Sequence, residues 1–150
     1  MEIDEQTEQE INQLYAASDG SYLVFTIHGH RFAYKSSLVQ EIMYDAKIHP
    51  LPFVPDYIEG VLNCRGNPYT VVNTLKMEGE QNPEIEEKIF LLFKREDDQF
   101  CIHISNIDVF FEPEEEEILE DSVKYKQEEI PLFDSDRVEQ TLCRDLNKEE

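Results

Sequence analysis

The chain has 150 residues, 40% of them hydrophobic, and a formal net charge of −21. This length fits one compact unit or two small intertwined lobes, and the apolar content excludes a wholly disordered chain. The negative charge repels nucleic acids and anionic membrane surfaces, so we expect neither as a partner and expect basic partners to be favoured.

The first elements in chain order are an N-terminal extension and a β-hairpin. Residues 1–21 are acidic and predict either a loose tail or a short docked helix. Alternating apolar residues predict strands over 22–27 and 31–35, joined by a turn at 28–30. Ser36 is then expected to cap a short helix. One side of that helix would carry Leu38, Val39, Ile42 and Met43.

A proline-rich stretch separates this hairpin from the next one. Three prolines lie between residues 50 and 55, which predicts an extended loop. Pro55 is suited to begin one helical turn that continues to Ile58. Asn73 is expected to cap a turn that carries Leu75. Between them we expect a strand over 61–64, a turn at 65–68 and a strand over 69–72.

The second half repeats this rhythm after a polar linker at 78–87. Apolar alternation predicts strands over 89–93, 100–104, 107–111 and 130–133. Asp134 or Ser135 is expected to cap a final helix. Two similar halves of short strands predict an all-β chain of two small barrels. We place the first lobe at about 22–77, and the second at about 88–143 of a single domain over 22–150.

The second half lacks one piece. Nothing after Phe111 resembles the stretch 52–66, and a glutamate-rich segment over 112–121 stands in its place. A like-charge block of this kind tends to stay solvated. A missing strand exposes sheet edges, so either this segment folds over the gap or another chain covers it.

The most specific motif lies between residues 51 and 73. It reads LPFVPDYIEGVLNCRGNPYTVVN, with Gly60-Val61-Leu62-Asn63-Cys64-Arg65-Gly66 at its centre. The segment resembles the central block of the CheW family of chemotaxis adaptors, in which a proline-rich loop leads to a Gly-Val-x-Asn-x-Arg-Gly turn and a strand ending in Val-Val-Asp. The upstream YLVFTIHGHRFAYKSSLVQEI resembles that family's first hairpin and its Val-x-Glu-Ile helix. The likeness is strong over 22–75 and weaker beyond it.

The resemblance implies two intertwined five-stranded SH3-like barrels, the second one shortened here. It implies a cytoplasmic, non-enzymatic scaffold, without cofactor or metal, in a membrane-associated receptor array. Its partners would be the hairpin tip of a chemoreceptor, the regulatory domain of a CheA-type histidine kinase and other CheW-like proteins. The receptor-binding residues would be Val39, Gly60, Asn63, Arg65 and Gly66. The kinase-binding residues would be Glu41 and Ile42.

Arg65 is the residue of this motif with the clearest chemistry. A guanidinium on an exposed turn can stack and donate several hydrogen bonds to a partner. The alternative is a solvated Arg65, or one paired internally with one of the many acids. Two positions depart from the family pattern, because Asn73 and Ser105 stand where it commonly has Asp.

Other candidate sites have weaker support. His28 and His30 could be half of a metal site, but turn histidines are more often simply exposed. Cys64 beside Arg65 could be a thiol of lowered pKa, or it could fill a small apolar pocket. The segment 112–121 lacks the ligand spacing of a calcium loop. Cys64, Cys101 and Cys143 are the three cysteines of the chain. Their odd number and the absence of a CxxC motif favour free thiols in a reducing compartment.

Two other functions remain open. The chain could be a CheW-like array linker that binds receptors or its own kind but no kinase, as the shortened second half would allow. It could also be a small thiol- or metal-dependent enzyme. The N-terminus shows no secretory signal pattern, and no apolar run has the length of a membrane span.

Overall fold

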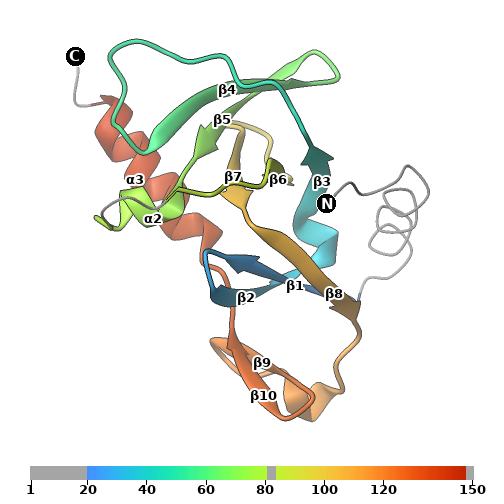
Figure 1. The fold of residues 1–150 in the computed structure, drawn as a ribbon. Coiled ribbons are helices and arrows are strands. Elements are labelled where there is room, and N and C mark those ends of the chain that lie inside the picture. The colour runs from blue at the N-terminus through green and yellow to red at the C-terminus, as the bar shows by residue number, and fades with distance from the viewer. Residues whose placement is uncertain (1–19, 81–83, 148–150) are drawn as a thin grey trace.

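The computed structural model describes residues 20–80 and 84–147, which form three mainly antiparallel sheets and one long C-terminal helix (Figure 1). The prediction of a tail or helix over residues 1–21 falls almost wholly outside these ranges. In the part of the chain that is described, no helix is long and apolar enough to cross a membrane.

The larger sheet has five strands in the order β3-β6-β7-β5-β4. The β5–β7 pair is parallel and the other pairs are antiparallel. His49, in the segment after β3, exchanges two backbone hydrogen bonds of 2.8 Å with Val61 on β4. The chain that leaves one edge strand therefore reaches the opposite edge. The strands are β3 (Val39–Tyr44), β4 (Ile58–Cys64), β5 (Asn67–Val72), β6 (Ile89–Phe93) and β7 (Phe100–Ile104).

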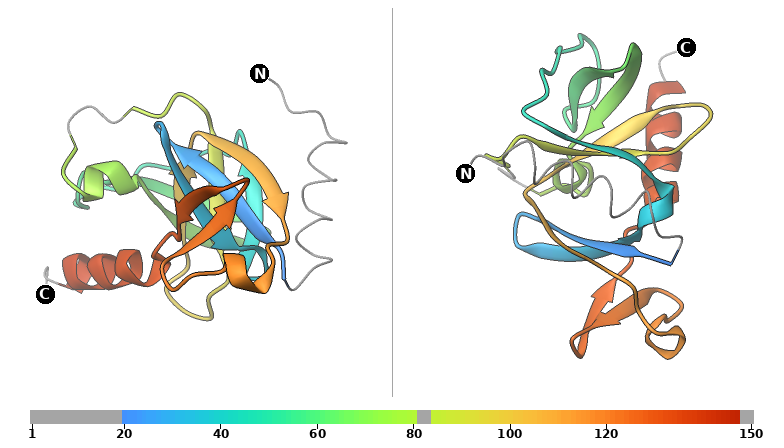
Figure 2. Two further views of the ribbon diagram at one scale, coloured as in Figure 1. Left: turned by 90° about the horizontal axis from the view of Figure 1, so that it is seen from below. Right: turned by 90° about the vertical axis from the view of Figure 1, so that its right-hand side faces the viewer.

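The smaller lobe combines a three-stranded sheet, β2-β1-β8, with a two-stranded hairpin of β9 and β10. A parallel bridge between Ala33 and Leu132 joins the two, and the Phe133 amide donates to the Ala33 carbonyl at 2.9 Å. Figure 2 shows this hairpin at the far end from β4. The strands are β1 (Tyr22–Ile27), β2 (His30–Lys35), β8 (Asn106–Phe111), β9 (Ser122–Tyr125) and β10 (Glu128–Pro131).

The two halves of the chain interleave in both sheets. β8 comes from the second half and pairs with β1 of the first. Conversely, β6 and β7 lie inside a sheet whose other strands come from the first half. The all-β prediction is confirmed, although the sheets do not close into complete barrels.

The predicted helix after Ser36 is wrong. Only Ser36–Leu38 forms a short 3-10 turn, and the chain then continues as β3 beside β6. The register shifts between Val39 and Glu41, and this bulge places Val39 and Ile42 on the same buried face. Their spacing of three residues imitates a helical period, which explains why the sequence pattern misled.

Three further elements differ from expectation. Pro55 does not begin a helical turn, because Asp56 and Tyr57 form a simple turn and β4 already starts at Ile58. The last strand pairs over Glu128–Pro131 instead of 130–133. β9 was not predicted, since its four residues carry only one strongly apolar side chain, Val123.

The acidic segment 112–121 leads into the hairpin of β9 and β10. Glu115–Glu117 forms an exposed 3-10 turn, in which the Glu114 and Glu117 side chains cap each other's backbone amides. The hairpin of β9 and β10 then buries Val123 and Ile130 against Tyr22, Val24 and Ala33. This hairpin, which follows the acidic segment, covers β2 through the Ala33–Leu132 bridge, so neither the glutamates nor another chain does so here.

Helices α2 and α3 begin at side-chain caps, as predicted. The Asn73 side-chain oxygen accepts from the Lys76 amide at 3.1 Å to start α2 (Thr74–Met77), so Asn73 performs the capping that an Asp would. Asp134 accepts from the Arg137 amide at 3.0 Å ahead of α3 (Ser135–Asn147). The apolar side of α3 buries Val138 and Leu142 against the main core.

Candidate functional site

The bend between β4 and β5 presents Arg65 to solvent. Arg65 and Gly66 are its two central residues, and their φ angles are +52° and +84°. Positive φ at both positions is the geometry of a type I′ hairpin turn, whose twist matches that of the flanking strands. The Arg65 side chain is 79% exposed. The bend is therefore accessible, as the resemblance requires.

Gly60 shapes the strand that leads to this bend. Its φ is +144°, at a register shift in the β4–β5 ladder. A Cβ atom built on Gly60 would lie 2.3 Å from the His49 carbonyl oxygen. Only glycine lets the 48–49 segment pass this close and make its bridge to Val61. Gly60 is buried, so its part is to shape the backbone.

Glu41 on β3 connects the bend to the opposite edge of the sheet. Its Oε1 accepts from the Arg65 guanidinium at 3.0 Å, and its Oε2 accepts from the Cys64 thiol at 2.7 Å. Glu41 is only 20% exposed, in contrast to Arg65. The sequence assigned Arg65 and Glu41 to two different binding surfaces, and the structure brings them into one cluster. The internal ion pair weighed as an alternative for Arg65 is present, yet most of the guanidinium still faces solvent.

The other predicted contact residues divide by burial. Val39 and Ile42 are fully buried in the main core. The bulge in β3 turns both side chains inward, so neither presents surface to a partner in this structure, and their assignment as contact residues stays a prediction. Asn63 is exposed on β4, opposite Pro68, and Gly66 has open space around it. Asn63, Arg65, Gly66 and part of Glu41 form the accessible set, which we call the β4–β5 bend site.

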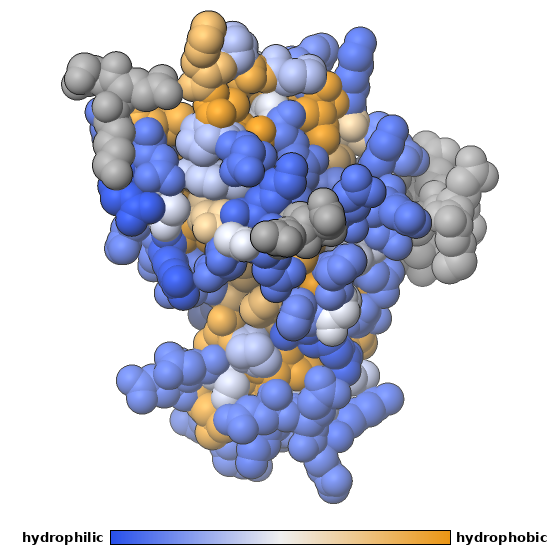
Figure 3. Space-filling model, turned by 60° about the vertical axis from the view of Figure 1, so that its left-hand side comes forward, coloured by the Kyte–Doolittle hydropathy of each residue, from blue (hydrophilic) through white to orange (hydrophobic). Residues whose placement is uncertain are grey.

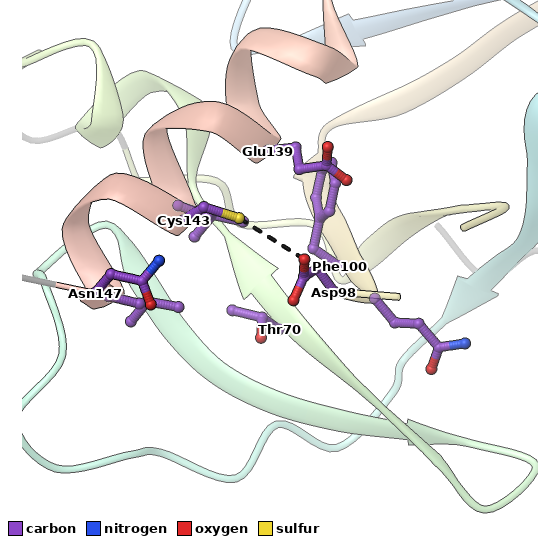
Figure 4. A pocket seen from close by; sticks show the side chains of 9 residues that line it. Thr70, Asp98, Phe100, Glu139, Cys143 and Asn147 are labelled. Carbon is purple, nitrogen blue, oxygen red and sulfur yellow. Dashed lines mark hydrogen bonds between the residues drawn. The ribbon is translucent and has the colours of Figure 1, made fainter. Parts of the chain in front are cut away.

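The three thiols are all held in the protonated form. Burial first, and then the Glu41 hydrogen bond and charge, raise the pKa of Cys64 to about 11. Burial likewise raises the pKa of Cys101, which has no exposed surface. In Figure 4, Cys143 on α3 points at Asp98 across a pocket of about 190 Å³, and desolvation followed by that carboxylate raises its pKa too. The hypothesis of a lowered-pKa Cys64 is wrong, since burial and the Glu41 carboxylate together raise the pKa of this thiol by more than Arg65 lowers it.

The histidines do not assemble with other ligands in the described ranges. Over residues 20–80 and 84–147, no group of three or more His, Cys, Asp or Glu side chains could hold a metal ion. His28 and His30 lie at an exposed turn. His103 is buried and pairs with Glu59, a contact that sequence patterns did not signal because it depends on the register of β4 and β7.

The molecular surface is mostly hydrophilic on the face in Figure 3, and hydrophobic atoms show both in the lower half and at the top, the end that carries β4 and the loop before it. That loop includes two exposed apolar residues, Leu51 and Phe53. Phe53 is 89% exposed. The end of the molecule that presents Arg65 therefore also offers apolar surface.

Comparison with known proteins gives one family and a structural likeness. Residues 21–133 match the family model described as the CheW-like domain. The crystal structure of the scaffolding protein TtCheW from Thermoanaerobacter tengcongensis superposes with a TM-score of 0.68 at 17% identity. The superposition covers 78% of this chain and 90% of that chain. At this identity the likeness shows the fold alone. The curated protein sequences give no match.

Proposed function

Because the chain belongs to the CheW-like domain family, we propose that it is a non-enzymatic adaptor that couples chemoreceptors to a CheA-type histidine kinase. It would work in the cytoplasm, in a bacterial chemotaxis array that is held at the membrane by the receptors. The description of TtCheW as a scaffolding protein supports this role by analogy.

The observation that carries the proposal is the exposed Arg65 of the β4–β5 bend site. Glu41 takes one hydrogen bond from one nitrogen of the guanidinium, and the 79% exposure of the Arg65 side chain leaves its other N–H groups accessible. These groups can donate to carbonyl or carboxylate oxygens of a receptor hairpin. Because Glu41 is mostly buried and fixed on β3, it orients Arg65 before the partner arrives, which lowers the ordering cost of binding.

The charge of the chain supports selectivity. A net charge of −21 disfavours nucleic acids and anionic lipid, and it makes Arg65 a local cation in an acidic field. A partner that offers an acidic or carbonyl-rich tip to Arg65 and basic groups to the surroundings would match this pattern.

The test compares two single charge reversals. Arg65→Glu changes the site, and Arg137→Glu is the matched control, since the Arg137 side chain on α3 is 69% exposed. Binding to a soluble receptor hairpin is measured by calorimetry, and binding to the kinase regulatory domain is measured separately. We expect Arg65→Glu to weaken receptor binding by about tenfold or more, equivalent to about 1.4 kcal/mol, and Arg137→Glu to leave it unchanged. Equal effects of both variants would remove Arg65 from the site.

The kinase experiment separates the adaptor from its nearest competitor. An adaptor binds both partners, whereas an array linker binds the receptor or its own kind but leaves the kinase domain in solution. Native protein that retains neither partner would overturn the proposed function.

A further inference from the structure

His103 on β7 contacts β4, β6 and the segment before β6, all in or beside the five-stranded sheet. Its Nδ1 lies 2.9 Å from Oε2 of Glu59 on β4. Its Nε2 contacts the carbonyl oxygen of Glu87, in the irregular segment 84–88 that precedes β6. The ring also packs on Phe90 of β6, with centroids 4.7 Å apart. A buried ring on β7 thus connects β4 with the segment that leads into β6.

Both nitrogens of this ring face acceptors. A carboxylate and a carbonyl each accept hydrogen bonds, and a neutral imidazole has only one N–H to donate. Only the imidazolium can satisfy both partners. The pairing of a buried cation with the Glu59 carboxylate stabilises that charged form.

We propose that His103 is a proton-dependent latch, which in its charged form fixes residues 84–87 against the five-stranded sheet and in its neutral form loosens them, with Ile85 still packed against the main core. This inference stands apart from receptor binding and does not depend on it.

The neutral form is expected to keep one contact and lose the other. A hydrogen bond to a carboxylate is stronger than one to a neutral carbonyl, so the remaining proton stays on Nδ1 and donates to Glu59. The lone pair of Nε2 then faces the Glu87 carbonyl oxygen, and this contact becomes repulsive. Residue 88 remains attached, since its carbonyl accepts from the Asp45 amide at 2.8 Å. The loosened stretch therefore ends at Glu87.

The surroundings of the ring set the direction of the pH dependence. Among the described residues, the charged groups that act on His103 are Glu59 on β4 and Glu87 on the segment before β6. Burial lowers the pKa of His103, but the hydrogen bond and charge of Glu59, with the Glu87 carbonyl, raise it above 6.5 overall. Cys101 on β7 stays a neutral thiol because burial raises its pKa. The latch is therefore closed at pH values well below the raised folded-state pKa, and it opens as pH rises through that pKa.

Loosening would change a groove of about 450 Å³ on the surface. Glu84, Glu86 and Glu87 line it together with His28, Gly29 and Ser105. Loosening of 84–87 would let three carboxylates move relative to the β1–β2 turn. The charge pattern of this face would then depend on the protonation of one buried side chain.

The test is an NMR titration of the full chain from about pH 6 to about pH 9, with histidine ring nitrogen shifts and backbone relaxation as readouts. We expect the pKa of His103 to lie above its ordinary value of 6.5, and the neutral ring to be the Nδ1–H tautomer. We also expect the order of residues 84–87 to fall with the same midpoint. The opening constant should rise by up to about tenfold per pH unit in that range.

Three variants complete the experiment. His103→Gln should abolish the pH dependence of residues 84–87. Glu59→Gln should lower the midpoint, because it removes a charge that favours the imidazolium. His28→Gln, at the exposed turn, should change neither the midpoint of the His103 titration nor the pH dependence of residues 84–87.

If His103→Gln does not fold, the native titration and Glu59→Gln still decide the question. A His103 pKa at or below 6.5, an Nε2–H tautomer in the neutral form, or unchanged order at 84–87 would each overturn the latch.

Discussion

Glu41 and Arg65 meet at 3.0 Å although they lie on β3 and at the end of β4, the two outermost strands of a five-stranded sheet. The contact shows that this sheet curls far enough for side chains on its two edge strands to touch, and the bridge between His49, which follows β3, and Val61 on β4 shows the same curl. Because Arg65 is 79% exposed, the pair contributes at most about 1 kcal/mol to folding. Its importance lies in the orientation of the guanidinium.

The first prediction concerns the thiol beside this pair. Glu41→Gln removes the charge that helps to raise the pKa of Cys64, so that pKa should fall from about 11 towards its ordinary range. Alkylation of Cys64 at a fixed mildly alkaline pH should then accelerate, because more of the thiol is thiolate.

This measurement needs a background without the partly exposed Cys143, so every protein compared carries Cys143→Ser. Glu41→Asp keeps the charge and serves as the control for altered packing. An alkylation rate in Glu41→Gln equal to that of the native residue would show that Glu41 does not control the thiol.

The second prediction compares two glycines of the same hairpin. Gly60→Ala places a methyl group 2.3 Å from the backbone oxygen of His49, which cannot move without breaking the bridge to Val61. We expect a loss of at least about 2 kcal/mol of unfolding free energy in urea.

Gly66→Ala is the matched control, since Gly66 also has positive φ but nothing lies within 4 Å of its added Cβ. It should cost about 1–2 kcal/mol, the strain of a left-handed backbone alone. If Gly60→Ala were the milder substitution, the close approach of residues 48–49 would not exist in solution.

The third prediction tests how α3 is attached. Leu142 is buried in the main core, whereas Leu146, one turn later, is 43% exposed. Leu142→Ala should cost about 2–5 kcal/mol in thermal or chemical unfolding. Leu146→Ala should stay within about 0.5 kcal/mol. Similar losses at both positions would mean that the helix packs on a different face.

The fourth prediction concerns the loop before β4. Phe53 is 89% exposed and has a φ of +59°, a conformation that costs a bulky residue energy. Phe53→Asn should stabilise the fold by up to about 1 kcal/mol, because asparagine tolerates the left-handed region. Val54→Ala should instead destabilise it, since Val54 packs against the core. A marked loss of stability in Phe53→Asn would indicate that Phe53 is buried in solution.

The local pattern of the sequence determined most of the strands and the hairpin motif. Alternation over 22–27 and 100–104 predicted β1 and β7, and the turn predicted over 65–68 falls between β4 and β5, where the structure confines it to Arg65 and Gly66. Asn73 and Asp134 were correctly assigned as caps. These features depend on neighbouring residues, so a linear pattern contains them.

The tertiary structure decided the rest. A bulge in β3 turned a helix-like spacing into a strand and buried Val39 and Ile42, and strand register brought Glu41 to Arg65 and Glu59 to His103. The partners of these pairs are 24 and 44 residues apart in the chain. Whether these side chains touch depends on the order and register of the strands and on how far the sheet curls. The free energy that selects this arrangement comes from core packing over the whole five-stranded sheet.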